Sequence, residues 1–315
     1  QDLNSLLSPP FRNKDSILPP TTTSFRQWAT HLEELAKTGA FENDRTFWMN
    51  QPYRKEKSFK TDASKEPLFI ECEIESVTAT IDAKTINEAR AKLRDEALDL
   101  HNLLTAAFIY ALVQGTREPI HTVWMEGHGR EDLIPGADLS RTTGWFTSLF
   151  PVVFESSLSA DTSETIREIK ATLSDLPNKG VTYGLLRYWG RDKDGNNLKE
   201  VSGSPEIIFN FLGQTKIAEE SNKGVKLLGD SIGLVRDSNN TQKAVLETNV
   251  ALEGEELVIH FNYNSLICAE NTVQNLADSF ERFLTRWISI EQNLDSTSIF
   301  SSSGLDEDDL ETLFK

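Results

Sequence analysis

The stretch that decides the fold lies at residues 120–131 and reads IHTVWMEGHGRE. Its first half, residues 120–125, is rich in β-branched and aromatic side chains, which predicts a strand. Its second half, residues 126–131, places two glycines around a histidine, and glycine lets the backbone turn tightly and approach another group. Four of these last six residues are Glu, His or Arg. The pattern predicts either a site built on a glycine-supported turn or a polar surface loop with Glu–Arg pairs.

Outward from this stretch, strand and helix patterns are mixed without strict βαβ alternation and without a repeat. Period-two patterns and apolar runs predict strands at residues 68–81, 120–125, 145–154, 206–212, 250–252 and 257–263. Helical periodicity predicts helices at residues 25–35, 41–49, 101–113, 165–176 and 273–287, with another beginning near 82. Polar, Pro-rich or aperiodic segments predict connectors at residues 1–22, 50–66 and 214–244. The expected fold class is α+β, a mixed α/β sandwich.

Charge and composition exclude several function classes. The 315 residues include 32 Lys plus Arg and 49 Asp plus Glu, which gives a net charge of −17. Such an acidic chain lacks the basic surface that nucleic-acid binding or polybasic membrane anchoring needs. The longest apolar runs fall short of a membrane span. Cys72 and Cys268 form no disulfide framework, which favours a reducing compartment, and we expect a cytoplasmic protein.

Motifs for common catalytic chemistries are missing from the sequence. There is no P-loop, no G-x-G-x-x-G between a strand and a helix, and no G-x-S-x-G nucleophile elbow. The spacing of Glu126, His128 and Glu131 does not match the helical H-E-x-x-H pattern of zinc enzymes. The sequence therefore predicts no bound metal.

Four segments, in order, resemble motifs of the epimerization domains of nonribosomal peptide synthetases, which are members of the condensation-domain superfamily. Residues 126–131 match EGHGRE at all six positions, and residues 141–152 resemble RTVGWFTSxxPV. Residues 179–184 resemble KGIGYG, with Thr182 where Gly is usual. Residues 209–214 resemble FNYLGQ, with Phe211 replacing Tyr. The resemblance runs from about residue 17 to about residue 300.

This resemblance implies a chloramphenicol acetyltransferase-like lobe. Residues 1–66 correspond to the end of the first lobe and a linker, and residues 67–315 to the complete second lobe. The family carries an HHxxxDG motif in its first lobe, whereas none of the five histidines of this chain is adjacent to another. By family order that motif falls before Gln1, so we expect the chain alone to be inactive or nearly so.

The activity implied by the resemblance is that of an isomerase in secondary-metabolite or antibiotic biosynthesis. Such a domain inverts L to D at Cα of an aminoacyl or peptidyl thioester carried by a peptidyl carrier protein. A positioned base removes the α-proton, donors stabilise the enolate oxygen, and a second group reprotonates the opposite face. No directly bound cofactor is implied, because the carrier protein supplies the phosphopantetheine. The implied partners are this carrier protein, the first lobe and neighbouring synthetase domains.

Among the candidate site residues, Glu126 resembles the acid/base of the second lobe. The alternative for Glu126 is a salt bridge to Arg130 or Arg141. His128 is expected to orient the turn rather than to act as a base. Phe211 lacks the hydroxyl of the family tyrosine, which puts activity in question if that hydroxyl contacts the intermediate. The residues expected along the substrate and pantetheine tunnel are His128, Arg130, Trp145, Ser148, Tyr183 and Asn210.

The sequence is also compatible with two other functions. One is a non-catalytic condensation-like module that only docks a carrier protein, and the missing HHxxxDG motif and Phe211 favour it. The other is a condensation domain that forms peptide bonds, which the EGHGRE and GWFTS segments disfavour. Because carrier domains are usually acidic, docking to this acidic chain is expected to use a local basic or apolar patch near Arg187 and Arg191.

Overall fold

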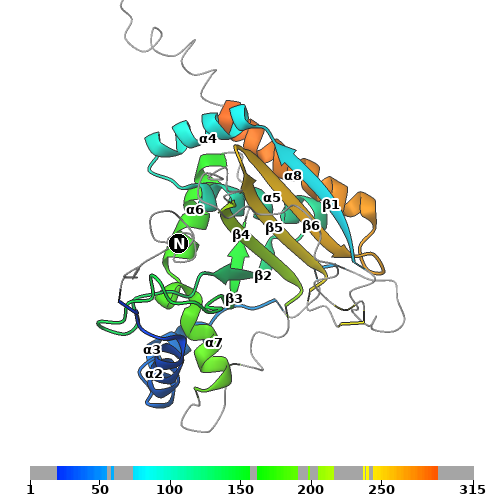
Figure 1. The fold of residues 1–315 in the computed structure, drawn as a ribbon. Coiled ribbons are helices and arrows are strands. Elements are labelled where there is room, and N and C mark those ends of the chain that lie inside the picture. The colour runs from blue at the N-terminus through cyan, green and yellow to red at the C-terminus, as the bar shows by residue number, and fades with distance from the viewer. Residues whose placement is uncertain are drawn as a thin grey trace, which may run out of the picture.

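A mixed sheet forms the centre of the molecule (Figure 1). The computed structural model describes residues 20–54, 58–59, 74–156, 162–190, 198, 205–215, 237, 239–240 and 244–289. Within these residues the sheet has six strands in the order β1-β6-β5-β4-β2-β3. Strand β4 is parallel to β2 and β5, and the other neighbours are antiparallel. The strands are β1 Ile74–Ile81, β2 Ile120–Gly127, β3 Ser148–Glu155, β4 Ile207–Thr215, β5 Leu246–Glu253 and β6 Glu256–Asn264.

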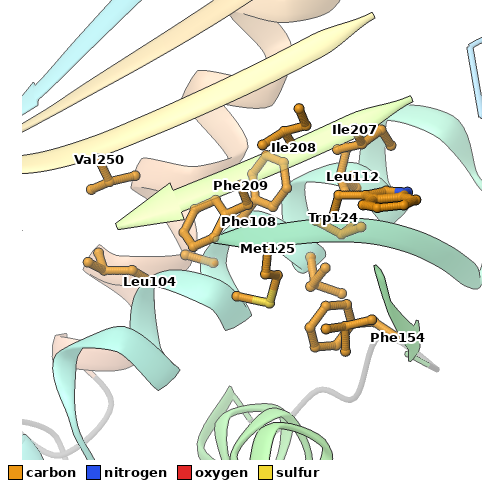
Figure 2. Close-up of a cluster of buried hydrophobic side chains, with 14 of the residues drawn as sticks. Leu104, Phe108, Leu112, Trp124, Met125, Phe154, Ile207, Ile208, Phe209 and Val250 are labelled. Atoms are coloured by element: carbon orange, nitrogen blue, oxygen red, sulfur yellow. The ribbon is translucent and has the colours of Figure 1, made fainter. Parts of the chain in front are cut away.

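Helices pack on one face of this sheet. They are α4 (Ala83–Asp95), α5 (Leu100–Thr116), α6 (Thr162–Ser174) and α8 (Glu270–Ser289). Two of them, α5 and α8, run behind the strands in Figure 1. Helix α5 is apolar nearly all round and packs between the sheet and α8, as a helix buried on every side must. Phe108 of α5 stacks on Phe209 of β4 with ring centroids 4.8 Å apart, in the cluster that Figure 2 shows.

The helices of the described part of the chain are short or polar relative to a membrane span. No single helix there is long and apolar enough to cross a membrane, and α4 with α5 passes only as a pair bent by 111°.

A smaller helical group packs at the end of the sheet near β3, at the bottom of Figure 1. It consists of α2 (Phe25–Lys37), α3 (Glu42–Met49), the 3-10 turn η3 (Pro177–Gly180) and α7 (Val181–Tyr188). Trp48 of α3 is fully buried and packs edge-on against Tyr183 of α7, with ring centroids 5.3 Å apart. Its indole N–H donates to the Thr182 hydroxyl at 3.4 Å. The threonine that departs from the KGIGYG pattern therefore has a packing role.

Most predicted elements are confirmed, with shifted ends. Asp82 caps α4, because its carboxylate accepts the Thr85 backbone N–H at 2.8 Å. The predicted strand at 145–154 begins only at Ser148, and the hairpin strand predicted from Val250 begins at Leu246. Cys268 is buried and free, whereas Cys72 lies outside the described residues. Residues 1–19, 60–73, 216–236 and 290–315 also lie outside them, so the predicted lobe boundary at residue 66 stays a prediction.

The buried histidine of β2 predicts a pH-dependent stability. Burial and the nearby Arg54 guanidinium lower the pKa of His121 from 6.5 to about 4. Between these two pH values His121 is protonated in the unfolded chain but neutral in the folded chain. The free energy of unfolding therefore falls as the pH drops through this range. We expect a loss of about 3 kcal/mol from pH 7 to pH 4 at this site.

Urea titrations at several pH values measure this loss, and His121→Gln is the matched variant because glutamine does not titrate. The imidazole Nε2 lies 3.1 Å from both the Thr116 hydroxyl and the Glu118 carbonyl oxygen, which an amide can also reach. Stability that falls equally in both proteins over this pH range would contradict the assignment to His121.

Candidate active site

Glu126 and Asn210 meet on the sheet face that points away from α5. Pairing of Met125 with Phe209 aligns β2 with β4, so the next residues along each strand, Glu126 and Asn210, lie side by side. Because Phe209 faces α5 and side chains alternate along a strand, Asn210 faces the other way. The Asn210 amide Nδ2 donates to Glu126 Oε2 at 3.0 Å. The EGHGRE and FNFLGQ segments thus meet in one hydrogen bond.

The polar contacts continue from Asn210 into β5. Asn210 is paired with Asn249 in the parallel ladder, and its Nδ2 also contacts Asn249 Oδ1 at 3.4 Å. Asn249 Nδ2 in turn donates to Glu247 Oε1 at 3.0 Å. Glu247 and Asn249 were not among the predicted site residues, because the predicted strand began only at Val250. Their alternation with Leu246, Thr248 and Val250 was the available signal for a longer strand with one polar face.

The turn after β2 is interlocked with the GWFTS segment. Gly129 has a φ of +67°, and a Cβ there would stand 1.7 Å from the carbonyl oxygen of Phe146. The Arg130 guanidinium lies 3.9 Å from the Phe146 ring centroid and donates to the carbonyl oxygens of Leu139 and Thr142, the latter at 2.9 Å. Arg130 therefore holds the turn against the next segment, and its guanidinium is directed there rather than to Glu126.

His128 and Lys179 fix the same turn through Glu131. His128 Nε2 lies 3.0 Å from Glu131 Oε1, and Lys179 Nζ lies 2.9 Å from Glu131 Oε2. His128 Nδ1 accepts the backbone N–H of Arg130 at 3.0 Å, so both ring nitrogens bind within the turn. This geometry agrees with an orienting role for His128. Lys179 and its neighbour Asn178 have φ values of +49° and +46°, which for non-glycine residues indicates a strained turn held by its surroundings.

The remaining tunnel candidates lie in different surroundings. Tyr183 is 1% exposed, packs against Trp124 with ring centroids 5.5 Å apart, and its hydroxyl accepts from Arg187 at 2.6 Å. Ser148 opens β3 opposite Gly127, and its buried Oγ has no hydrogen-bond partner among the described residues. Trp145 is 83% exposed, so within this structure it does not form a buried wall. The structure thus brings together Glu126 and Asn210 of the predicted set and places Tyr183 in the core.

Arg187, a member of the expected docking patch, has its guanidinium among aromatic side chains. Its guanidinium lies 5.5 Å from the Trp124 ring centroid and 5.8 Å from that of Tyr183. These contacts and its bond to the Tyr183 hydroxyl explain its half-buried position. Arg191, the other member of that expected patch, lies outside the described residues.

Phe211 lies on the opposite face from Asn210. Its ring stacks on His101 of α5, with centroids 6.1 Å apart and an interplanar angle of 14°, and it packs against the hydrophobic core. Burial lowers the pKa of His101, so the stacked imidazole is favoured in its neutral form. The departure from the family tyrosine therefore removes a hydroxyl from the helix side of β4, away from Glu126.

No cluster of three or more His, Cys, Asp or Glu side chains with metal-binding geometry occurs among the described residues. The candidate centre is a carboxylate held by an amide on a sheet face, an arrangement suited to moving a proton.

A mixed sheet with helices on one face and this carboxylate on the other matches the α+β lobe expected from the sequence. The chain belongs to the condensation domain family, whose model matches residues 10–304. The similarity to the condensation-domain superfamily seen in the motifs is therefore confirmed.

Relatives add to this membership, although the chain spans only a small part of their length. It is 34% identical to one of the subunits of linear gramicidin synthase from Brevibacillus parabrevis, over 84% of its own length and 3% of that protein. It is 30% identical to surfactin synthase subunit 1 of Bacillus subtilis, over 95% of its own length and 8% of that protein.

Solved structures share the fold. The epimerization domain from the third module of tyrocidine synthetase B superposes with a TM-score of 0.78 at 25% identity, covering 88% of this chain and 62% of that domain. A cyclization-docking bidomain from Sorangium cellulosum superposes with a TM-score of 0.62 at 14% identity, over 88% of this chain and 55% of that one.

Proposed function

We propose that this chain supplies one half of an epimerization active site, in which Glu126 exchanges the α-proton of an aminoacyl or peptidyl thioester. The observation that carries the proposal is the hydrogen bond from Asn210 to Glu126, which joins two epimerization-type motifs at a single carboxylate. The similarity to the tyrocidine synthetase epimerization domain supports it. The substrate is carried on the phosphopantetheine of a peptidyl carrier protein, which is the proposed partner.

The proposed chemistry is a proton exchange without net change in composition. A base takes the α-proton, the C–H electron pair moves into the enolate, and a second acid returns a proton to the opposite face of Cα. Asn210 fixes one carboxylate oxygen of Glu126 and so sets the orientation in which the carboxyl gains or loses its proton. The opposing acid/base is proposed to come from the HHxxxDG motif of a first lobe. In this proposal the first lobe packs against the side of the sheet that carries Glu126.

An isotope experiment separates this function from its alternatives. A protein that joins this chain to a first lobe is incubated in H₂O with an α-deuterated L-aminoacyl thioester on its carrier protein. Epimerization predicts loss of deuterium together with appearance of the D-thioester. A condensation domain would retain the deuterium and form a peptide bond with an added acceptor, and a docking module would bind the carrier and do neither.

The chain by itself is expected to leave the deuterium in place, because only one of the two proposed acid/base groups is present. The measurement is the same deuterium assay with the 315-residue chain alone. Racemisation by this chain without any first lobe would contradict the proposed division of the site.

Restoring the family tyrosine is expected to change little. Because Phe211 stacks on His101 on the helix side of β4, Phe211→Tyr adds a hydroxyl away from Glu126. We expect the exchange rate to change by less than about threefold, which corresponds to less than about 0.7 kcal/mol in the barrier. The deuterium-loss assay measures this rate. A gain of tenfold or more would show that the tyrosine hydroxyl reaches the reacting centre.

A further inference from the structure

We propose that Glu247 is a positioning residue for Glu126, acting through the amides of Asn249 and Asn210. Its role in turnover rests on the proposed function of Glu126, but the orientation of the amides can be measured without turnover. Glu126, Asn210, Asn249 and Glu247 form a hydrogen-bonded row across three adjacent strands, β2, β4 and β5. We name these four residues the amide row.

Carboxylates at both ends fix the direction of the amide row. An ionised carboxylate only accepts hydrogen bonds, so Asn249 must turn its Nδ2 toward Glu247. Its Oδ1 then points toward Asn210, and there it accepts from Asn210 Nδ2. Asn210 therefore presents a donor, not an acceptor, to Glu126. The charge at Glu247 thus selects the amide orientation that stabilises ionised Glu126.

The opposite orientation suits the protonated carboxyl. If Asn249 turned its Nδ2 toward Asn210, then Asn210 would turn its Oδ1 toward both neighbours. A carboxylate facing that oxygen is repelled, whereas a protonated carboxyl donates to it. The amide row thus has two consistent arrangements, one for each protonation state of Glu126, and Glu247 favours the ionised one.

The partly buried surroundings of the amide row strengthen its hydrogen bonds. Its four side chains are half-buried, so hydrogen bonds there are less screened than on an exposed surface. On the same face, His260 of β6 is paired with Asn249 and bonds the Thr78 hydroxyl of β1 at 3.0 Å. The charged side chains of the turn after β2 and of the segments packed on it contact one another and nearby rings. Glu131 binds His128 and Lys179, Arg130 lies on the Phe146 ring, and Arg187 lies near the rings of Trp124 and Tyr183.

Through-space repulsion and the amide row predict opposite signs. Removing the negative charge of Glu247 weakens repulsion, and by Coulomb's law alone Glu126 would then ionise more easily. The two carboxylates stand two strand spacings apart, roughly 10 Å, where this effect is about 0.3 pH unit or less in water. Loss of the amide orientation makes Glu126 harder to ionise. The direction of the change therefore identifies the mechanism.

The test follows protonation of Glu126 directly. The chain is labelled with ¹³C at glutamate carboxyls, the Glu126 resonance is assigned by its loss in Glu126→Gln, and its titration midpoint is measured. We expect Glu247→Gln to raise this midpoint by about 0.5–1 pH unit, because a hydrogen bond to a charged group supplies roughly one unit or more. Glu253→Gln, at the exposed end of the same strand β5, is the matched control and is expected to leave the midpoint unchanged.

A second variant, at Asn249, tests the amide row without changing Glu247. Asn249→Leu removes the link, so it is expected to raise the midpoint by itself. In that background Glu247→Gln should raise it no further, because the two changes act through the same contact. A midpoint that falls or stays constant in Glu247→Gln, in a protein whose melting temperature shows that it is folded, overturns the proposal.

Measurements of the exchange rate distinguish the role of the amide row from the acid/base role of Glu126. With a first lobe present, Glu247→Gln is expected to shift the acidic limb of the exchange-rate profile upward by the same interval and to leave the plateau rate within about threefold. A shifted midpoint in a protein in which Glu126→Gln leaves exchange intact would uphold the amide row and overturn the acid/base role of Glu126. An unshifted midpoint in a protein in which Glu126→Gln abolishes exchange would overturn only the amide row.

Discussion

Glu126→Gln is expected to lower the rate of α-proton exchange by about 10²- to 10⁴-fold, the usual contribution of a positioned acid/base. Glutamine keeps the shape of glutamate and still accepts the Asn210 Nδ2 hydrogen bond through its carbonyl oxygen. It has no lone pair basic enough to take the α-proton and no acidic proton to return. The measurement is loss of α-deuterium from a carrier-bound thioester in a protein that includes a first lobe.

Two controls make this result specific to proton transfer. Glu155→Gln changes an exposed glutamate at the far end of β3 and should leave exchange unchanged. Binding of the loaded carrier protein to Glu126→Gln should equal that of the unsubstituted protein, because the substitution leaves the fold and the turn intact. Exchange at the normal rate in Glu126→Gln would remove the acid/base role, whereas lost carrier binding would assign Glu126 to substrate docking.

Gly129→Ala is expected to have the largest effect on stability among the turn residues. The glycine has a φ of +67°, and an added Cβ would lie 1.7 Å from the Phe146 carbonyl oxygen. A backbone atom cannot move aside as a flexible side chain can, so the turn and the GWFTS segment must separate. We expect a loss of about 2–5 kcal/mol, the sum of a left-handed backbone cost and an overpacking cost. Urea unfolding monitored by tryptophan fluorescence measures this loss.

Gly136→Ala is the matched control for that loss. Gly136 also has a positive φ, +77°, but a Cβ there would meet nothing within 4 Å. It should therefore show only the backbone cost of about 1–2 kcal/mol. Equal losses for the two variants would mean that the approach of Gly129 to Phe146 contributes nothing beyond backbone conformation. A larger loss for Gly129→Ala would show that the two motifs are fixed to each other by this contact.

The turn after β2 was the part of the site that the sequence predicted best. Two glycines around a histidine after a β-rich run were enough to predict a strand that ends in a tight turn, and β2 with the turn at Gly129 confirms it. The resemblance of four segments to epimerization motifs then singled out Glu126 and Asn210. Each of these predictions depends on residues that are neighbours in the chain, where backbone preferences and spacing act directly.

The positions of Tyr183, Trp145 and Phe211 were not accessible in the same way. All three lie in motif segments, yet one is in the core against Trp124, one is exposed, and one stacks on His101. A motif shows that a residue is near a site along the chain, but not which way its side chain points. That direction follows from strand alternation and from which helix covers which face.

By itself, the sequence determined the α+β class, the strand that leads into the EGHGRE segment, the glycine turn there and the amphipathic or buried character of the main helices. These are properties of local periodicity and composition. Only the tertiary structure showed that Glu126, Asn210, Asn249 and Glu247 form one row, because they come from three strands far apart in the chain. Parallel pairing of β4 with β2 and with β5 sets that row, and strand register is fixed by packing of the whole sheet.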